Sequence, residues 1–387
     1  MSRGTDPAAH RQNKEFMSMS TTTRAAVVES GGAPFTLSEV VLDQPAQGEV
    51  LVRMVAAGLC HTDLGVAGGG LPFPLPGVLG HEGAGVVEAV GPGVTSVVPG
   101  DHVVLSFTSC GDCANCRDGH PAYCATWLPL NLLGGRRADG TSTISRDGEE
   151  LGGHFFGQSS FAEHALVDER GLVKVDPDVP LDSIAPLGCG VQTGVGAVWN
   201  VLEPRAGSTL VVLGAGAVGL SAVMAAALTP ATTVIAVDKV GGRLDLAKEL
   251  GATHTVNASE VADITEAIME ITGGRGADGV VETTGSVFVL RKGVDALAAR
   301  GTLVIVGAPP FGTEVSLDVN GMLGGKRVVG LTLGDNEIQT AIPVLVQLVK
   351  EGRLPLDRLI SRYKFEDIGQ AVADMSGGRS IKPVLTF

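Results

Sequence analysis

Four of the six cysteines of this chain lie in one short segment, CGDCANCRDGHPAYC, at residues 110–124. The spacing C-x2-C-x2-C-x7-C allows Cys110, Cys113, Cys116 and Cys124 to converge on one tetrahedral ion, because thiolates two residues apart can bind the same metal. A disulfide pair and an iron–sulfur cluster are the alternatives. Four thiolates leave no position for water, so the pattern predicts a structural zinc site.

The other two cysteines and one histidine stand beside glycines in three separate motifs. Cys60 lies in GLCHTDLG, His81 in GHEGAG and Cys189 in LGCGVQTG. One such residue alone is usually core or surface, but together they form the Cys2His ligand set of a catalytic zinc that keeps one position open. Glu82 is expected beside this metal or as an alternative ligand, and Asp63 is expected to orient the imidazole. The alternative for each acid is a solvated carboxylate.

A third motif, GAGAVG at 214–219, fits the pattern G-x-G-x-x-G. The pattern is weak by itself, but here it follows the β-branched run TLVVLG and precedes an alanine-rich helix, which is the context of a dinucleotide site. Asp238 ends the next strand-like run, where a carboxylate binds the ribose 2′-hydroxyl and repels a 2′-phosphate. The motif therefore predicts NAD rather than NADP, and the alternative for Asp238 is a turn cap.

The elements that must hold these motifs fall into two groups. Up to about residue 175, short β-rich runs between Gly and Pro predict a barrel-like domain: RAAVVE, EVLVRMVA, GVVEAVG, DHVVLSF and FAEHALV. After PLGCGVQTG, strands alternate with helices, which predicts a parallel doubly wound sheet. The expected strands are TLVVLG, TVIAVD, HTVN, GVVETTG and TLVIVG, and the expected helices include 217–228, GRLDLAKELGA, VADITEAIMEITGG, VLRKGVDALAARG and AIPVLVQLVKEG. The strand IKPVLTF closes the chain.

Composition narrows the class of protein. A chain of 387 residues suits two domains, and 44% hydrophobic with only 4% aromatic residues suits an α/β core. The formal net charge of −14 argues against nucleic acid and anionic membranes as partners. The uncharged stretch 206–237 is long enough for a membrane span, but its strand–turn–helix pattern argues against one. Residues 1–22 are expected to be a disordered extension without a secretory signal, which places the protein in the cytoplasm.

The motifs in their order and spacing resemble the zinc-dependent medium-chain alcohol dehydrogenases from about residue 24 to the end. The resemblance is carried by CHTD, GHEGAG, the four-cysteine loop, LGCGVQTG, LGAGAVGL, AVD and PVLTF. The segments LPFPLP, VVLSF, FFGQSSFAEHA and PLGCGVQTG look most like the aryl-alcohol (benzyl-alcohol) dehydrogenase branch. The resemblance implies a GroES-like catalytic domain at 23–190 and 334–387 around a Rossmann NAD-binding domain at 191–333, with the active site in the cleft between them.

The resemblance also implies roles for individual residues. Two zinc ions per chain are expected, one on Cys60, His81 and Cys189 and one on the four-cysteine loop, with Thr62 bonding the substrate alkoxide. The residues expected around NAD are His61, Thr193, Gly214, Gly216, Ala217, Val218, Gly219, Asp238, Arg243, Val306 and Lys382.

Two positions differ from the liver-type pattern. His61 stands where many members have an arginine near the pyrophosphate, and Gly65 stands where liver-type enzymes have a proton-relaying histidine. Strand alternation would point His61 away from Thr62 and towards the cofactor. The proton is therefore expected to leave through water or ribose hydroxyls.

The implied reaction is the reversible NAD-dependent oxidation of a primary alcohol, aromatic or allylic, to an aldehyde. Leu71, Phe107 and Trp127 are candidate walls of an apolar pocket. One alternative is a glutathione-dependent formaldehyde dehydrogenase, which would need a basic anchor that the sequence does not reveal. Another is a non-catalytic zinc- and NAD-binding protein, which would have no need of an open zinc site with Thr62 beside it.

The long segment 125–160 resembles that of the family's dimers, so a homodimer is expected, with a tetramer as the alternative. TLVIVG would then pair with its copy across the two-fold axis.

Overall fold

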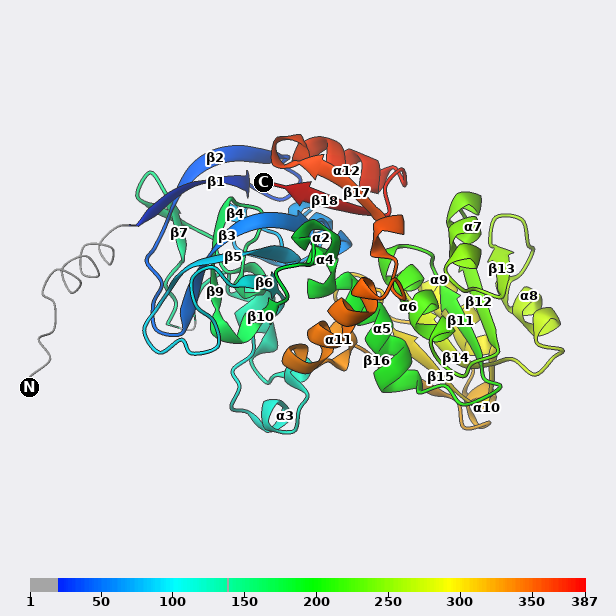
Figure 1. The fold of residues 1–387 in the computed structure, drawn as a ribbon. Helices are drawn as coiled ribbons and strands as arrows, with labels where there is room; N and C mark the ends of the chain where they lie inside the picture. The colour runs from blue at the N-terminus through cyan, green and yellow to red at the C-terminus, as the bar shows by residue number, and fades with distance from the viewer. Residues whose placement is uncertain (1–19, 138) are drawn as a thin grey trace, which may run out of the picture.

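The computed structural model describes residues 20–137 and 139–387, which form a β-rich lobe and a parallel-sheet lobe side by side (Figure 1). The predicted N-terminal extension at 1–22 lies mostly outside the described residues. Strand β1 begins at Thr21, so the last two residues of that prediction belong to the first sheet.

The β-rich lobe contains two curled sheets. Their strand orders are β4-β1-β2-β7-β8 and β10-β6-β5-β3-β18-β17, with β9 paired to β3. The strands are β1 (Thr21–Val28), β2 (Phe35–Leu42), β3 (Glu49–Gly58), β4 (Gly77–Val78), β5 (Gly83–Val90), β6 (His102–Leu105), β7 (Ile144–Arg146), β8 (Glu149–Leu151), β9 (His164–Asp168), β10 (Leu172–Val175), β17 (Ile360–Lys364) and β18 (Lys382–Thr386). The five strands predicted from β-branched runs are confirmed as β1, β3, β5, β6 and β9.

Both ends of the chain build this lobe. Strand β18 runs antiparallel to β3 in the register Val384↔Gly58. The C-terminal segment therefore pairs with the strand that ends just before Cys60. The other helical elements of the lobe are α2 (His61–Ala67), α3 (Ala114–Arg117), η1 (Pro121–Tyr123), η2 (Pro129–Leu133), η3 (Phe155–Gly157), η4 (Glu169–Gly171), α4 (Leu181–Ile184), η5 (Ala185–Gly188), η8 (Leu356–Arg358), η9 (Phe365–Asp367) and α12 (Ile368–Ser376).

The second lobe is a six-stranded parallel sheet in the order β13-β12-β11-β14-β15-β16. Its strands are β11 (Thr209–Leu213), β12 (Thr233–Asp238), β13 (His254–Asn257), β14 (Ala277–Glu282), β15 (Leu297–Ile305) and β16 (Arg327–Gly330). Its helices are α6 (Ala217–Ala227), α7 (Gly241–Glu249), α8 (Ile264–Ile271), α9 (Val287–Asp295) and α10 (Val319–Met322). The doubly wound sheet is therefore confirmed, and the uncharged stretch forms β11, α6 and β12. Within the described residues, none of the helices has the length and hydropathy that crossing a membrane requires.

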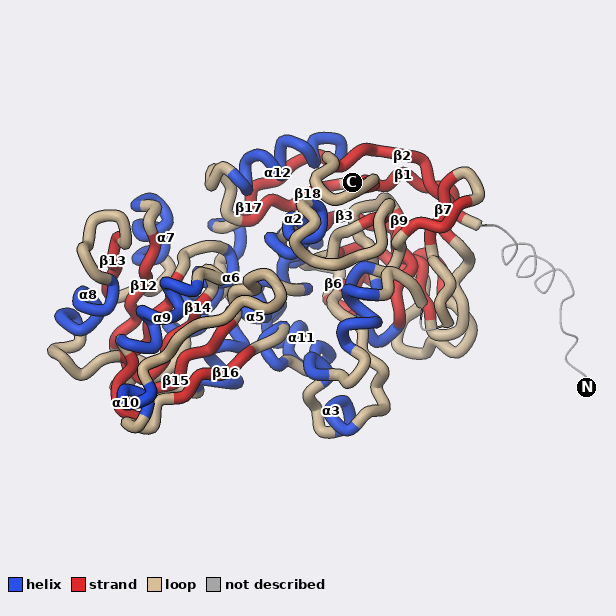
Figure 2. The backbone as a smooth tube through the Cα atoms, turned by 180° about the vertical axis from the view of Figure 1, so that it is seen from behind, coloured by secondary structure: helices blue, strands red, loops and turns tan. Residues whose placement is uncertain are grey.

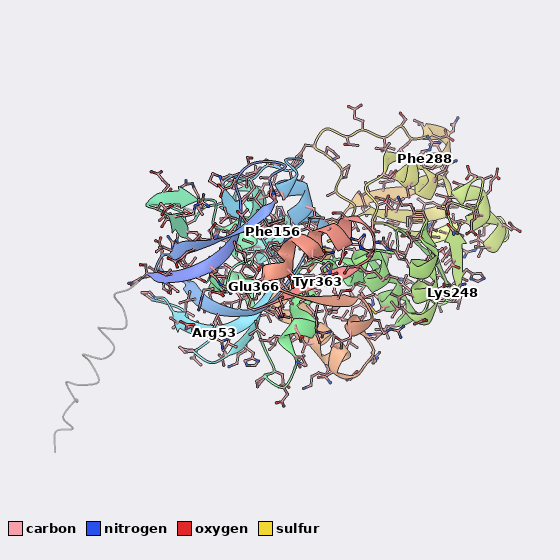
Figure 3. The ribbon with its side chains drawn as sticks, turned by 90° about the horizontal axis from the view of Figure 1, so that it is seen from above. Arg53, Phe156, Lys248, Phe288, Tyr363 and Glu366 are labelled. Atoms are coloured by element: carbon pink, nitrogen blue, oxygen red, sulfur yellow. The ribbon has the colours of Figure 1, made fainter. Side chains whose placement is uncertain are left out.

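The chain crosses between the lobes twice, and both crossings meet at the centre of the molecule (Figures 1 and 2). The first crossing is α5 (Gly190–Gly196) with η6 (Ala197–Leu202). The second is η7 (Leu333–Asp335), which leads into α11 (Ile338–Lys350). Figure 3 shows Phe288 and Lys248 on the parallel-sheet lobe, away from Phe156 in the β-rich lobe.

Two details of the parallel sheet differ from expectation. The helix predicted at 289–301 ends at Asp295, and the chain is already in β15 from Leu297. Arg300 has a φ of 64°, and the pairing register between β14 and β15 shifts near it. Because the start of β15 is irregular, its sequence does not alternate between apolar and polar residues, and the pattern there was mistaken for a longer helix.

The strand TLVIVG belongs to β15, which is paired with β14 on one side and with β16 on the other. The prediction that this strand pairs across a two-fold axis is therefore wrong, because its edges are already occupied. Strand β16 occupies the edge of the sheet among the described residues.

Candidate active site

Three side chains from distant segments converge beside the first crossing. Cys60 caps α2, His81 follows β4, and Cys189 caps α5. Their ligand atoms all lie within 4.8 Å of one another, and Cys60 and His81 are buried. The buried Nε2 of His81 has no hydrogen-bond partner within 20–137 and 139–387. Two sulfurs and an orphaned imidazole nitrogen fit the ligand set of a zinc ion that keeps a position open.

Asp63 holds this cluster in place from the first turn of α2. It is fully buried, and its carboxylate accepts hydrogen bonds from the backbone N–H of Cys60 at 2.8 Å and of Gly80 at 3.1 Å. The Nδ1 of His81 lies 3.0 Å from Asp63 Oδ1 and donates to it, which leaves Nε2 as the free lone pair. Asp63, in the first turn of α2, therefore fixes the backbone of the candidate ligand Cys60 and the tautomer of the candidate ligand His81.

Cys60, His81 and Cys189 shift one another's pKa values. A hydrogen bond from Cys189 holds the pKa of Cys60 well below its usual value, and the same contact, with burial, raises the pKa of Cys189. Burial opposes the charging of His81, but Asp63 and Cys60 outweigh it and raise the pKa of His81 to about 10. A metal cation would displace these protons, because it binds thiolate and neutral imidazole.

Beneath the cluster lies a buried ion pair. The Nζ of Lys382 donates to Glu82 Oε1 at 2.9 Å and Oε2 at 2.8 Å, and to the Leu59 carbonyl at 3.1 Å. Oε1 also accepts from the Gly190 N–H at 2.9 Å. Burial raises the pKa of Glu82 to about 7 against the opposing effect of Lys382. The pair thus ties β18 to the segment of His81; contact of Lys382 with a cofactor stays a prediction.

Aromatic rings pack against the buried imidazole of His81. Phe156 stacks on the imidazole at a centroid distance of 4.4 Å, and Phe155 meets it edge-on at 5.4 Å. Trp127 packs edge-on against Phe156 at 5.5 Å, and Phe73 against Phe155 at 5.1 Å. We call Phe73, Trp127, Phe155 and Phe156 the aromatic cluster.

Of the three residues predicted to line an apolar pocket, only Trp127 belongs to the aromatic cluster. Leu71 lies beside Gly65, where its Cδ1 would be 3.1 Å from an added Cβ. Phe107 is instead buried and lines a cavity of about 480 Å³ beside the four-cysteine loop. Phe107 is therefore not part of the aromatic cluster, and its role as a wall of an apolar pocket stays a prediction.

Sequence reasoning missed Phe73, Phe155 and Phe156. The adjacent phenylalanines before Gly157 were the available signal, and they were used only as part of a family resemblance. Phe156 has a φ of 51°, a left-handed conformation that a non-glycine residue rarely adopts. The turn aims both neighbouring rings at His81, and nothing in a strand or helix pattern predicts this.

Helix α2 changes the expected geometry of His61 and Thr62. Both lie in its first turn rather than on a strand, so the alternation argument that separated them is wrong. Thr62 Oγ lies 3.8 Å from Cys60 Sγ, which places the hydroxyl at the candidate metal site. His61 keeps exposed surface but is partly desolvated by the surrounding protein, and this desolvation, together with the charges of Lys382 and Arg243, lowers its pKa.

The four-cysteine loop forms a second cluster, whose sulfur atoms all lie within 4.8 Å of one another. Backbone N–H groups point at the sulfurs, with Cys113 N at 3.3 Å from Cys110 Sγ and Ala125 N at 3.4 Å from Cys113 Sγ. The Ala125 N–H lowers the pKa of Cys113 to about 6, whereas desolvation raises the pKa of Cys116 to about 12. Four convergent sulfurs supported by N–H donors fit a closed tetrathiolate zinc site.

The glycine motif lies between β11 and α6 as expected. Gly214 has a φ of 97°, and a Cβ on Gly219 would lie 1.8 Å from the Gly214 carbonyl. At Gly216, the N-cap of α6, a Cβ would meet no atom within 4 Å, and no side chain caps the helix. The open space at this helix N-terminus fits a phosphate group. Asp238 accepts from the N–H of Ala215 at 2.7 Å and of Val240 at 2.9 Å.

The remaining cofactor candidates are scattered around this loop. Ala217 and Val218 form the first turn of α6. Thr193 is buried in α5 and donates to the Cys189 carbonyl at 2.8 Å, and the N–H of Val306 donates to the Glu282 carbonyl at 2.8 Å. Arg243 lies in α7, with its Nε buried and without a partner among the described residues.

Comparison with known proteins identifies the family. The profile of the alcohol dehydrogenase GroES-like domain matches residues 46–177, and that of the zinc-binding dehydrogenases matches residues 217–347. A geraniol dehydrogenase from Castellaniella defragrans is 42% identical over 94% of this chain and 97% of its own length. The chain belongs to the zinc-dependent medium-chain alcohol dehydrogenases. It is therefore an alcohol dehydrogenase of the zinc-binding type, a family that uses zinc and a nicotinamide dinucleotide.

Solved structures of the family have the same fold. An alcohol dehydrogenase zinc-binding domain protein from Burkholderia ambifaria matches with a TM-score of 0.92 and 53% identity, over 95% of this chain and 100% of that chain. The benzyl alcohol dehydrogenase of Acinetobacter calcoaceticus matches with a TM-score of 0.91 and 45% identity, over 95% of this chain and 99% of that chain.

Proposed function

We propose that this dehydrogenase oxidises primary aromatic or allylic alcohols to aldehydes with NAD as the hydride acceptor, and catalyses the reverse reaction. The observation that carries the substrate class is the aromatic cluster, which lies directly on His81. Planar aromatic side chains stack favourably on planar unsaturated groups. The two relatives named for geraniol and benzyl alcohol support the same class.

The residues present divide the work of the reaction. A zinc ion on Cys60, His81 and Cys189 would supply Lewis-acid activation of the alcohol oxygen, and NAD would accept the hydride. Thr62 would receive the alcohol proton on its hydroxyl, a role supported by its distance of 3.8 Å from Cys60 Sγ. The buried rings of Phe155 and Phe156 pack on the imidazole of His81 and help to exclude water from it.

The route by which the proton leaves follows from two positions. Gly65 has no side chain, and Leu71 occupies the space next to it. The positive charges of Lys382 and Arg243 help to lower the pKa of His61 in α2, which supports a place for His61 on their side of the helix. We therefore assign His61 to cofactor binding, and the proton to water or the ribose hydroxyls.

Asp238 carries the choice of NAD over NADP. Both of its carboxylate oxygens are fixed by backbone N–H groups of the phosphate-binding loop and the following turn. A fixed carboxylate at this position repels a 2′-phosphate and can accept from a 2′-hydroxyl.

The test is a comparison of alcohols and cofactors by the absorbance of reduced nicotinamide. We expect kcat/KM for benzyl alcohol and for an allylic alcohol to exceed that for a saturated alcohol of equal size by at least about tenfold, a difference of about 1.4 kcal/mol. Phe156→Ala should reduce this ratio while leaving NAD binding unchanged. A saturated alcohol used as well as benzyl alcohol would refute the substrate class. Equal use of NAD and NADP would refute the role of Asp238.

The same assay separates the alternatives. A glutathione-dependent formaldehyde dehydrogenase would require glutathione for turnover, and a non-catalytic zinc- and NAD-binding protein would bind NAD without turnover of any alcohol.

We also propose a homodimer, formed through the edge strand β16 rather than β15. Strand β16 presents an unpaired edge among the described residues, and nearby side chains are apolar and exposed: Phe311 at 66%, Val319 at 77% and Leu323 at 78%. Unpaired edges of this kind are commonly covered by a partner. Light scattering should give the mass of a dimer, and Val319→Asp with Leu323→Asp should give a monomer. A monomeric mass for the unmodified chain at micromolar concentration would exclude the dimer, and a mass of four chains would indicate the tetramer.

A further inference from the structure

The second crossing between the lobes is conformationally strained. Leu333, Gly334 and Asp335 have φ values of 50°, 77° and 51°, so three consecutive residues are left-handed and two of them are not glycine. Such residues persist only where surrounding contacts hold them. A contact to the Asp335 side chain therefore helps to hold the left-handed turn.

One set of contacts comes from the first crossing. Asn200 Nδ2 donates to the Gly334 carbonyl at 2.8 Å, and Asn336 Nδ2 donates to the Gln192 carbonyl at 3.1 Å. At Gly196, an added Cβ would lie 2.1 Å from the Gly334 carbonyl oxygen. The two crossings are thus packed closely together, and a shift of η7 would disturb its contacts with α5 and η6.

A further contact with η7 comes from a histidine of the four-cysteine loop. His120, between Cys116 and Cys124, lies with its Nδ1 2.8 Å from Asp335 Oδ1. The Asp335 side chain is only 16% exposed, so this contact is shielded on one side. Within the loop, the N–H of His120 donates to the Asn115 carbonyl at 2.9 Å, which fixes the backbone that carries the imidazole.

From η7 the contacts continue to a candidate metal ligand. Gln192, whose carbonyl is held by Asn336, donates through Nε2 to Ser106 Oγ at 2.8 Å and to the Gly188 carbonyl at 2.6 Å. Cys189 follows Gly188 directly in the chain and is the N-cap of α5. The opposite face of α5 lies against the helix of the glycine motif, since a Cβ on Gly194 would be 2.2 Å from the Val218 carbonyl oxygen.

We propose that His120 is a positioning residue, which, through Asp335 and the strained turn η7, holds α5 and therefore Cys189 in register with the cofactor helix α6. The four-cysteine loop then has a purpose beyond its own folding: it supports the catalytic cluster from the far side of the interlobe junction. Coupling between His120 and α5 is measured by comparing variants of the loop for their effect on α5.

The experiment compares the unmodified zinc-loaded protein with His120→Ala, His120→Asn and Arg117→Ala. Asn places an amide N–H where the imidazole Nδ1 stands, so it should restore the contact with Asp335. Arg117 is on the same loop and pairs only with the exposed Asp112 among the described residues, so it is the matched control.

Hydrogen exchange by mass spectrometry is the primary readout, because it does not depend on any substrate. We expect His120→Ala to speed exchange in peptides covering α5 by about three- to tenfold, the change that loss of one hydrogen bond produces in a local opening equilibrium. His120→Asn and Arg117→Ala should leave this exchange near that of the unmodified protein. Asp335→Asn should behave like His120→Ala in part, and its effect should not add to that of His120→Ala.

Kinetics are the second readout, and this part rests on the proposed function. His120→Ala should lower kcat for benzyl alcohol by about three- to tenfold with little change in the KM for NAD, since α5 carries a metal ligand. If the unmodified protein oxidises no alcohol, the proposed function fails while the exchange result still decides this inference. Unchanged exchange in α5 with His120→Ala, or equal acceleration with Arg117→Ala, would overturn it.

Discussion

The buried pair of Lys382 and Glu82 leads to a quantitative prediction about stability. The two side chains are 2% and 0% exposed, and the ammonium contacts both carboxylate oxygens. Removal of one partner of such a pair costs about 3–5 kcal/mol, because it leaves an uncompensated buried charge. Lys382→Met should therefore lower the free energy of unfolding by about 3–5 kcal/mol, and Glu82→Gln by a similar amount.

The double variant distinguishes this reasoning from simple loss of packing. With Lys382→Met and Glu82→Gln together, no buried charge is left, so the loss should be much smaller than the sum of the single losses, with a coupling energy of about 2–4 kcal/mol. Urea unfolding followed by circular dichroism, in zinc-containing buffer and at one protein concentration, measures all four proteins. Losses that simply add would refute the argument.

The effect of pH has a definite sign. Burial raises the pKa of Glu82 from 4.5 to about 7 even with Lys382 present, and the variant without the ammonium should have a higher value still. A group whose pKa is raised on folding favours the folded state at low pH and loses that contribution as pH rises through the folded pKa. The destabilisation by Lys382→Met should therefore be nearly constant below about pH 7, where Glu82 is protonated in both folded proteins, and should grow above that pH. Lys350→Met is the control: its pair with Asp176 is solvent-exposed and screened by water, so its removal should change the free energy of unfolding far less than Lys382→Met does.

Three further predictions follow from the site and its surroundings. Gly58→Ala would place a Cβ 2.1 Å from Glu82 Oε2, so it should lower the free energy of unfolding by about 1–3 kcal/mol and reduce zinc content; an unchanged unfolding midpoint would contradict the close packing. Burial lowers the pKa of His154 to about 4, so the unfolded state takes up a proton that the folded state does not. Stability should then fall by up to about 3 kcal/mol as pH drops from 6.5 to 4, and His154→Leu should flatten this loss in urea titrations unless another group causes it. Metal analysis should find about two zinc ions per chain, falling to about one with Cys113→Ser, which should also unfold at lower temperature. His81→Ala should abolish turnover and keep NAD binding; a single zinc in a fully active chain would contradict the two-site assignment.

Patterns that depend on neighbours in sequence were predictable. The four cysteines converge because a few intervening residues cannot carry thiolates far apart, and GAGAVG forms the β11–α6 loop because glycine is needed where a Cβ would meet the backbone. Alternation and β-branching located most strands of both lobes. The order of the motifs indicated the family, and the family resemblance supported the expectation that Cys60, His81 and Cys189 lie together.

Errors arose where local pattern was ambiguous. The segment after Cys60 contains only one helical turn before its next glycine, so it resembled a continued strand, and the Asp63 cap that starts α2 is recognisable only with the backbone in place. Strand β15 resembled an edge because the sequence of β16, RVVG, is too short to stand out.

The sequence by itself determined the two lobes, the four-cysteine loop and the dinucleotide turn, because each depends on contacts within a short segment or on a repeating pattern. Only the tertiary structure decided that Lys382 pairs with Glu82, that Phe155 and Phe156 stack on His81, and that His120 meets Asp335. These contacts join segments separated by long stretches of chain. Their formation depends on how β18 closes the sheet and how the two crossings pack, which no local periodicity encodes.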